Sequence, residues 1–421
     1  MKILIENVRS FCGPHKIPLR PLTLLVGENS TGKTTFLAMV AHISKPGFPS
    51  FRPSFNLPPF DLGTYDSIAT YKGGRYGRAD YFGVGFEDRE RKRRTKVAAT
   101  YISSMGQPHL SKVEVMSAGS SLLLRMEGDT AQGKVSIKGP AGEEEHTVTV
   151  EPLARAPENM PFAYFIHYFM FELKIKPANR EPFFRLMNRW GSETLGPVLA
   201  LAPVRTKPRR TYDEISDEFK PEGDHIPILL ARIWQEKGSS RRERLVEALT
   251  AFGVSSSLFE ELGVKRLGKR PSDPFQILVT MAGPPANLPD VGYGVSQALP
   301  VIVQSILAEK RTMLLLQQPE VHLHPRGQAA LGSFFSTLVA KDKKRFVIET
   351  HSDYLLDRIR IEVASGRLRA DDVLLLFFEK SGMETHVHPI RLDAHGNVLD
   401  APSSYRRFFM EEEGTLMSRT E

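Results

Sequence analysis

Gly27, Gly32, Lys33 and Thr34 fit the spacing G-x-x-x-x-G-K-[ST] within the stretch "LVGENSTGKTTFL". Glycines at these positions let backbone N–H groups turn around a phosphate, and the lysine brings positive charge to it. The start of a following helix adds a partial positive charge of its own. The pattern therefore predicts a site for the phosphates of a nucleotide.

The loop and the first turn after it supply the residues that we expect to bind the nucleotide. They are Gly27, Asn29, Ser30, Thr31, Gly32, Lys33, Thr34 and Thr35. The Thr34 hydroxyl is in addition the expected ligand of Mg²⁺.

Two later stretches carry polar residues where a ligand could be contacted. In "DVGYGVSQALP", Ser296 and Gln297 follow a glycine-rich turn and open a predicted helix, where N–H groups and a hydroxyl would face an anion. The competing interpretation is an ordinary helix cap. In "THSD", His351 follows an apolar strand, and ligands bind at the carboxyl ends of parallel strands. His351 is therefore expected to contact a γ-phosphate or to orient a water molecule.

The motifs GENSTGKTT, G-V-S-Q, Q-P-E-V-H-L-H-P and E-T-H-S-D follow one another in this order. In this they resemble the ABC-type ATPases of the SMC, RecF and OLD-like branch. More narrowly, they are similar to the stand-alone AAA ATPases of bacterial anti-phage systems such as Septu and PARIS, in which an ATPase partners a separate nuclease. The motifs lie towards the two ends of the chain, and the central region is not diagnostic.

The resemblance implies ATP and Mg²⁺ as cofactors and an ABC-ATPase-like fold. In such ATPases the nucleotide is held between two subunits, so Ser296 would contact the γ-phosphate bound by the partner subunit's Lys33. The chain would then assemble as a homodimer or a higher homo-oligomer through ATP. It would control a separate effector, such as a nuclease.

The stretch "LLLQQPEVHLHP" departs from the pattern of these relatives. They carry a metal-binding acid followed by an acidic base where this chain has Gln317 and Gln318. An amide brings no negative charge and cannot act as a general base. Three interpretations stay open: Gln317 is an engineered replacement of glutamate, Glu320 or His351 orients the water instead, or the chain is a switch that scarcely hydrolyses ATP. The candidate catalytic residues are Gln317, Gln318, Glu320 and His351, and Gln317 is also a candidate metal position.

The elements that must position these residues follow from apolar patterning. Near-continuous apolar strands that alternate with helices predict a mostly parallel sheet covered by helices, and short alternating segments predict an antiparallel subdomain. The fold class is therefore α/β, with an antiparallel β subdomain and a helical insertion. We expect strands over 2–8 and 22–26, a turn over 12–16, a helix over 33–43, antiparallel strands over 81–150, helices over about 152–268, and alternating strands and helices thereafter.

Three domains are predicted from this organisation. Residues 1–150 form an N-terminal ATPase lobe with the phosphate loop and the antiparallel subdomain. Residues 151–270 form a mainly helical insertion, and residues 271–421 form a C-terminal ATPase lobe.

Composition bounds the function. Hydrophobic content of 41% and charged content of 25% are typical of a soluble globular protein, and no apolar run approaches the roughly 20 residues of a membrane span. A single cysteine, Cys12, fits the reducing cytoplasm. The formal net charge of +7 permits contact with nucleic acid without requiring it.

Other stretches give weaker signals. Asp61 is expected to replace the glutamine of the loop that usually follows the first sheet. The H-x-H of His322 and His324 is more typical of packing than of a metal site. Basic runs such as "RERKRRTK" are more often solvated than bound to phosphate. Arg205, Arg209 and Arg210 could lie near a neighbouring subunit's nucleotide, and the aromatic stripe over 162–171 is interpreted as a core in preference to an interface.

Two functional hypotheses remain. In the first, the chain is an ATP-binding and ATP-hydrolysing protein of anti-phage defence that controls a partner nuclease. In the second, it is a compact RecF-like DNA-binding ATPase of DNA repair or chromosome maintenance. A transporter ATPase is disfavoured by the sequence Q-P-E-V-H-L-H-P.

Overall fold

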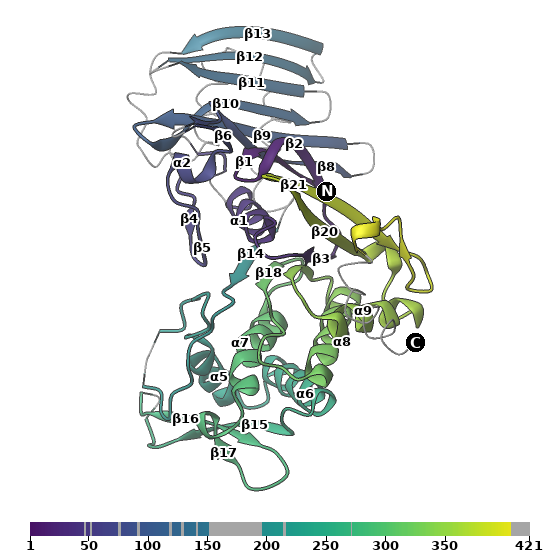
Figure 1. Ribbon diagram of the computed structural model, residues 1–421. Coiled ribbons are helices and arrows are strands. Elements are labelled where there is room, and N and C mark those ends of the chain that lie inside the picture. The colour runs from purple at the N-terminus through teal and green to yellow at the C-terminus, as the bar shows by residue number, and fades with distance from the viewer. Residues whose placement is uncertain are drawn as a thin grey trace, which may run out of the picture. The chain divides into compact units, whose positions relative to one another are not determined.

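The computed structural model describes residues 1–45, 48–50, 53–74, 77–90, 93–117, 120–127, 130–139, 142–150, 196–213, 216–270 and 272–405. The chain divides into two compact units (Figure 1). Unit 1 contains Met1–Leu19, Glu28–Val198 and Phe378–Val387, and unit 2 contains Arg20–Gly27, Leu199–Phe377 and His388–Glu421. The division falls within the phosphate-loop sequence, because Gly27 ends a segment of unit 2 and Glu28 begins a segment of unit 1.

Unit 1 is built on an eight-stranded sheet with the order β13-β12-β11-β10-β9-β8-β1-β2, in which neighbouring strands pair antiparallel. The antiparallel subdomain predicted over 81–150 is therefore confirmed. The strands are β1 (Lys2–Val8), β2 (Phe11–Pro18), β8 (Phe82–Glu90), β9 (Arg93–Ser104), β10 (Gln107–Ser117), β11 (Ser120–Glu127), β12 (Thr130–Gly139) and β13 (Gly142–Val150).

Strand β2 corrects one expectation. The segment 12–16 was predicted to be a turn, but it lies inside β2, and its residues Pro14, His15 and Lys16 pair with β1. β2 is the edge strand of the sheet. Proline is tolerated on edge strands, where a missing N–H need not break a ladder bond.

Helix α1 (Lys33–Ile43) has the predicted bounds, and most of its residues are buried. Short elements accompany it in unit 1. They are β4 (Asn56–Leu57), β5 (Phe60–Asp61), α2 (Tyr65–Ile68), β6 (Tyr71–Gly73) and β7 (Gly77–Arg78). The proline-rich sequence around them therefore forms only two-residue to four-residue pieces.

The last turn of α1 contributes His42 to an aromatic cluster in the core of unit 1. The imidazole is 4% exposed and stacks on Phe55, with ring centroids 3.9 Å apart and 18° between the planes. Phe48 and Tyr101 approach its ring edge-on. Burial lowers the pKa of His42 to about 3, so the ring is neutral in the folded protein at physiological pH.

We expect His42→Phe to weaken the acid sensitivity of the fold. In the unfolded chain His42 gains a proton as the pH falls below about 6.5, whereas in the folded chain it stays neutral down to about 3. The contribution of the neutral His42 ring to the free energy of unfolding is therefore fully present above pH 6.5 and is lost as the pH falls below it. This loss amounts to about 2 kcal/mol between pH 7.5 and pH 5. Denaturant titrations of both proteins at the two pH values measure this difference.

Other buried histidines make the comparison of two proteins necessary. Burial also lowers the pKa of His15 and of His225, and both stay in the variant. Only the difference in pH dependence between the native chain and His42→Phe reports on His42. An identical loss of stability in both proteins would show that His42 is protonated in the folded state.

A seven-stranded sheet with the order β14-β18-β19-β3-β20-β21-β22 lies for the most part in unit 2. β18 pairs parallel with β19, and β19 pairs parallel with β3. These three strands are buried almost throughout, as the apolar runs predicted. The strands are β3 (Leu22–Gly27), β14 (Val198–Leu201), β18 (Met313–Gln317), β19 (Arg345–Glu349), β20 (Val373–Ser381), β21 (Glu384–Leu392) and β22 (Val398–Leu399).

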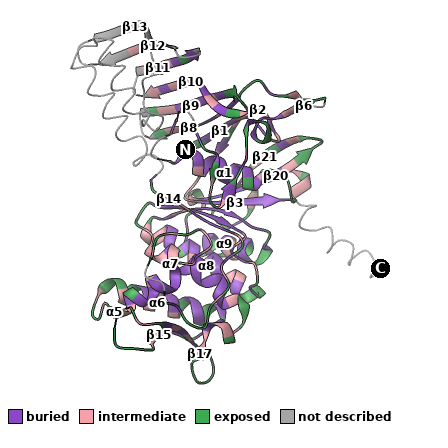
Figure 2. Ribbon diagram, turned by 90° about the vertical axis from the view of Figure 1, so that its left-hand side faces the viewer, coloured by how far each residue is buried: buried purple, intermediate pink, exposed green. Residues whose placement is uncertain are grey.

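Helices of unit 2 accompany this sheet, and α7 is buried along most of its length (Figure 2). The mixed α/β fold class, with parallel and antiparallel sheets and helices, is confirmed. The helices are α5 (Ile226–Gln235), α6 (Ser240–Ser256), α7 (Tyr293–Leu307), α8 (Pro325–Asp342) and α9 (Asp353–Ala364), with short 3-10 turns at η2 (Leu288–Asp290) and η3 (Ala370–Asp372). Among the described residues, no helix has both the length and the hydropathy that crossing a bilayer requires.

The expectation of helices throughout 152–268 is only partly met. Helices α5 and α6 are present, but β14 belongs to the seven-stranded sheet and β15 (Glu261–Arg266) to a small antiparallel sheet. That small sheet also contains β16 (Phe275–Thr280) and β17 (Ala286–Asn287), so β16 is not part of the parallel sheet as predicted. Short apolar runs do not reveal their pairing partners. Residues 151–195, with the aromatic stripe, lie outside the described residues.

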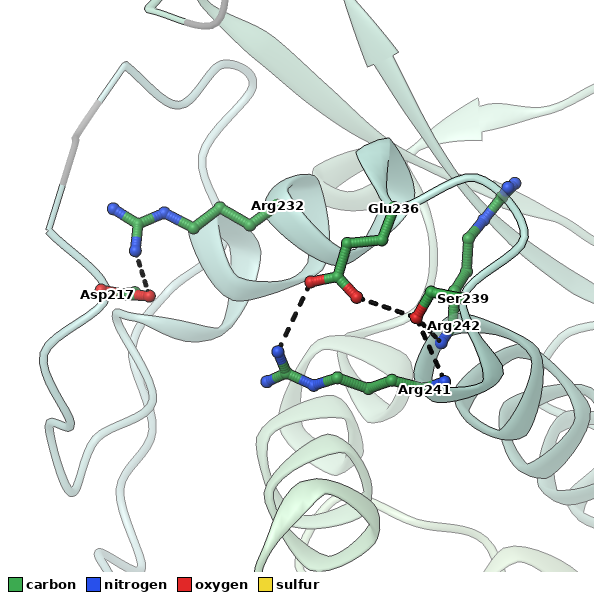
Figure 3. A network of polar contacts seen from close by, with 6 residues as sticks. All are labelled: Asp217, Arg232, Glu236, Ser239, Arg241 and Arg242. Atoms are coloured by element: carbon green, nitrogen blue, oxygen red, sulfur yellow. Dashed lines mark hydrogen bonds and ion pairs between the residues drawn. The ribbon is translucent and has the colours of Figure 1, made fainter.

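The junction between α5 and α6 shows how polar contacts set a helix start (Figure 3). The Ser239 hydroxyl accepts hydrogen bonds from the backbone N–H groups of Arg241 and Arg242, at 3.2 and 3.4 Å. It also donates to Glu236 Oε2 at 3.0 Å. Such a cap satisfies N–H groups that have no partner within the helix. Helix α6, which packs on α8, therefore begins at a fixed residue.

Candidate functional site

The phosphate loop has a backbone that only glycine adopts without strain at two points. Gly27 has φ 133° and Gly32 has φ 98°. A Cβ atom at Gly32 would lie 3.0 Å from the Phe11 ring, so the close approach also requires glycine. Helix α1 begins immediately afterwards at Lys33. These are the local features that the motif predicts for a phosphate-binding loop.

Lys33 folds back over this loop. Its side chain is buried, and Nζ donates to the backbone oxygen of Glu28 at 2.6 Å. The Thr31 hydroxyl donates to the same oxygen at 2.8 Å. Thr35 is buried and its hydroxyl accepts from Arg9 at 3.4 Å. Lys33 therefore lies against the loop whose bound phosphates it is expected to contact.

The other predicted residues of the loop are at the surface. Asn29, Ser30 and Thr34 are exposed, and Ser30 has a φ of 61°. An exposed hydroxyl at the first turn of α1 fits the role of a Mg²⁺ ligand predicted for Thr34. The loop and the helix start thus fit a nucleotide phosphate and its cation.

In unit 2, β3, β18 and β19 end at one edge of the sheet. Gln317 is paired with Glu349, and Glu349 with Leu25. Gln318 follows with a φ of 43°, and its N–H donates to Glu349 O at 2.8 Å. The N–H of Thr350 donates to Leu25 O at 3.1 Å. The predicted catalytic positions in β18 and after β19 therefore lie at the edge where β3 ends.

Glu320 is the buried carboxylate of this edge. Its Oε1 accepts a hydrogen bond from the backbone N–H of His351 at 2.8 Å, and Oε2 has no hydrogen-bond partner among the described residues. Burial raises the pKa of Glu320, and hydrogen bonds from His351 and Thr350 oppose this. The side chain of His351 is exposed. The structure thus brings Glu320 and the His351 backbone together.

Arg205 lies in the same cluster, only 3% exposed. Its Nη2 donates to Gln317 O at 3.4 Å, and the negative charge of Glu320 favours its protonated form. Desolvation nevertheless lowers the pKa of Arg205 to about 10. The location of Arg205, Arg209 and Arg210 near a neighbouring subunit's nucleotide stays a prediction. In the structure Arg205 lies beside its own chain's Gln317 and Glu320.

Gln328 in α8 links the two loops of this edge, and no pattern in the sequence marked it as a candidate. Its Nε2 donates to Leu323 O at 2.8 Å, and its Oε1 accepts from the Ser352 hydroxyl at 2.5 Å. Ser352 in turn caps α9 by accepting from Leu355 N–H at 3.0 Å. The Gln328 side chain therefore hydrogen-bonds both the turn after Glu320 and the turn that carries His351.

Ser296 does not open its helix as predicted. Helix α7 begins three residues earlier, at Tyr293, and the Ser296 hydroxyl donates to Tyr293 O at 2.8 Å. Gly292 is the residue before the helix, so the cap interpretation of Ser296 also fails. Gln297 is 2% exposed, and its Nε2 has no partner among the described residues. A pocket borders Ser296, and Lys207 and Arg209 also line it.

The histidines of the H-x-H sequence have separate contacts. His322 meets the Tyr293 ring edge-on at 5.1 Å, and His324 Nδ1 accepts from Gly327 N–H at the start of α8. Within the part of the chain that the structure describes, no three His, Cys, Asp or Glu side chains gather as metal ligands would. These contacts are packing and capping contacts.

Two other sequence signals make contacts within unit 1, where Asp61 also interacts electrostatically with Arg9. Asp61 accepts a hydrogen bond from Gly63 N–H at 3.1 Å. In the basic run, Arg94 is paired with Glu87 and Lys96 with Glu114, each at 2.8 Å. Pairs of this kind at a surface contribute little energy.

Comparisons with known proteins place the chain in a family. No curated protein matches it. Among solved structures it is similar to the SMC head domain from Thermotoga maritima, with 10% identity over 92% of this chain and 97% of the other and a TM-score of 0.41. A Pyrococcus furiosus Smc head domain bound to the C-terminal domain of ScpA gives 10% identity, coverage of 93% and 96%, and a TM-score of 0.45. At these scores nothing about activity follows.

A family match covers residues 22–357, and the family is described as "AAA domain, putative AbiEii toxin, Type IV TA system". This range contains the phosphate loop, the edge with Gln317 and Glu320, and His351. Since it includes most of the 421 residues, the chain belongs to this AAA-domain family.

Proposed function

We propose that the chain binds and hydrolyses ATP, with the phosphate loop holding the nucleotide and Glu320 orienting the attacking water. The observation that carries this is the carboxylate itself. It is buried, one oxygen is held by His351 N–H, and the other has no partner among the described residues. A carboxylate whose pKa is raised by burial is a stronger base than an exposed one.

Mg²⁺ would be held by the Thr34 hydroxyl together with the phosphates, since magnesium sites commonly combine few protein ligands with substrate oxygens. The bound ion would neutralise charge on the phosphates. Gln318 is a weaker candidate for catalysis than Glu320, because an amide cannot accept the proton of a water molecule.

The same proposal extends to assembly and partners. Ser296 on α7 would contact the γ-phosphate held by the partner subunit's Lys33, so two copies would close on ATP. The dimer, or a larger homo-oligomer, would hold or release a separate effector of anti-phage defence, with a nuclease as the expected class. The residue support for this step is Ser296 and the buried amide of Gln297 beside it, together with the pocket that Ser296 borders.

Light scattering and ATP turnover of the full chain test this proposal. We expect ATP, but not ADP, to double the mass in solution, and slow release of phosphate to accompany it. Duplex DNA is added in a parallel series, in which a clear rise in turnover would favour the DNA-acting alternative. ATP binding without a change in mass would exclude the sandwich, and absence of ATP binding would exclude the whole proposal.

A further inference from the structure

The edge of the unit 2 sheet at which β3, β18 and β19 end contains buried polar atoms that have no partner among the described residues. They are Nε and Nη1 of Arg205, Nε2 of Gln317 and Oε2 of Glu320. The three side chains are 3%, 7% and 6% exposed. Three of these four atoms are hydrogen-bond donors, and a buried donor without a partner is costly. The arrangement is therefore that of a site whose ligand accepts hydrogen bonds.

The residues that carry these atoms are neighbours at the end of β18. Arg205 Nη2 reaches the backbone oxygen of Gln317, so the guanidinium lies against the end of β18. The charges of Arg205 and Glu320 also influence each other. Taking a guanidinium out of water costs several kcal/mol unless an anion compensates it fully. Glu320 gives Arg205 only part of this compensation, because one of its oxygens is already committed to His351 N–H.

We propose that Arg205 and Gln317 form the subsite for the terminal phosphoryl group of ATP, beside the carboxylate of Glu320. This rests on the proposed function and names the groups of unit 2 that recognise the third phosphate. Phosphoryl oxygens only accept hydrogen bonds, and arginine N–H groups and an amide NH₂ only donate them. The remaining acceptor, Glu320 Oε2, is available to a water molecule.

The subsite assigns a reason to the glutamine at position 317. Its buried NH₂ group cannot ligate a cation, so Gln317 is here a hydrogen-bond donor to phosphate and not the metal position that the resemblance implied. A glutamate at 317 would place a second negative charge next to Glu320 and the phosphoryl group. Neighbouring like charges repel strongly in a buried site.

Binding of ATP and ADP to the full chain tests the subsite, because only ATP has the third phosphate. We expect Arg205→Met to weaken ATP affinity about 10- to 100-fold, the range for hydrogen bonds to a charged group, and to leave ADP affinity unchanged. Arg205→Lys, which keeps a charge, should recover part of the loss. Titration calorimetry with each nucleotide, with and without Mg²⁺, gives the ratio directly.

Arg391→Met is the matched control. Arg391 is an exposed arginine of unit 2 that is paired with Asp400 at 2.7 Å, and its loss should leave both affinities unchanged. A structural defect in Arg205→Met would lower ATP and ADP affinity together, and this result would overturn the subsite. An unchanged ratio of ATP affinity to ADP affinity in Arg205→Met would overturn the subsite as well. If Arg205→Met binds both nucleotides as the native chain does, the proposed function stays intact.

Gln317→Glu separates the phosphate subsite from a metal position. If Gln317 donates a hydrogen bond to the phosphoryl group, Gln317→Glu should bind ATP more weakly, and its turnover should not rise. As a metal position, the new carboxylate would strengthen Mg²⁺-dependent ATP binding and raise turnover, which contradicts the subsite. A native chain that binds neither ATP nor ADP would overturn the subsite and the proposed function together.

Discussion

Glu320→Gln is expected to lower ATP turnover by about two to four orders of magnitude, the usual contribution of a general base. The amide keeps the size of the side chain and can still accept the hydrogen bond from His351 N–H. It cannot accept a proton from water at the position of Oε2. Glu320→Gln should therefore bind ATP with little change in affinity and turn it over far more slowly. Steady-state phosphate release and equilibrium binding of ATP measure the two quantities separately.

The pH dependence of turnover gives a second readout for Glu320. Burial raises the pKa of its carboxyl group, so activity should fall on the acid side at a higher pH than an exposed glutamate would give. Glu320→Gln should lose this acid limb along with the rate.

Glu362→Gln is the matched control for this substitution. Glu362 is also a buried carboxylate of unit 2, but it is paired with Arg367 and bonded to Ser333. Its replacement should cost stability and leave turnover per folded molecule unchanged. Native turnover in Glu320→Gln would contradict the role of Glu320, and His351 would be the next candidate.

The parts of the fold that the sequence predicted well are those with local signals. Helix α1 follows a glycine loop, so its start at Lys33 could be predicted from the chain itself. The apolar runs of β18 and β19 identified them as buried strands. Each of these signals lies within a few residues of the element that it marks.

The parts that the sequence could not give depend on distant pairing. Nothing in the run "VLAL" shows that β14 joins a sheet with β18, more than a hundred residues later. Arg205 follows β14, so its contact with Gln317 depends on that pairing. The same holds for Gln328, whose role comes from two loops that meet only in the folded unit. The pairing of β16 in a separate sheet was missed for the same reason.

The candidate site divides in the same way. The phosphate loop is contiguous in sequence, and its glycines were recognisable from spacing alone. Glu320 was named as a candidate from the sequence, but the reason for preferring it over Gln318 is spatial. Its contact with His351 N–H and its unpartnered oxygen appear only when β18 and β19 are side by side.

Lys33→Met is expected to abolish measurable nucleotide binding by lowering the affinity for ATP and for ADP about 100-fold or more. Lys33 brings charge to the β- and γ-phosphates, and ADP keeps the β-phosphate, so both ligands depend on it. Charge-assisted hydrogen bonds are about twice as strong as neutral ones. Methionine keeps most of the buried stem, which limits the damage to packing. This loss of both nucleotides contrasts with the ATP-selective loss expected for Arg205→Met.

Lys344→Met provides the matched control, because Lys344 is an equally buried lysine with a structural contact. It is 2% exposed, and its Nζ donates to the backbone oxygens of Ser305 and Ile306 at the end of α7. Its loss leaves these carbonyls without that donor, so the melting temperature should fall while nucleotide affinity stays native. Calorimetric titration with ATP and ADP and a thermal melt of each variant separate the two effects. Native affinity in Lys33→Met would mean that the loop after β3 does not hold the phosphates, whatever its spacing suggests.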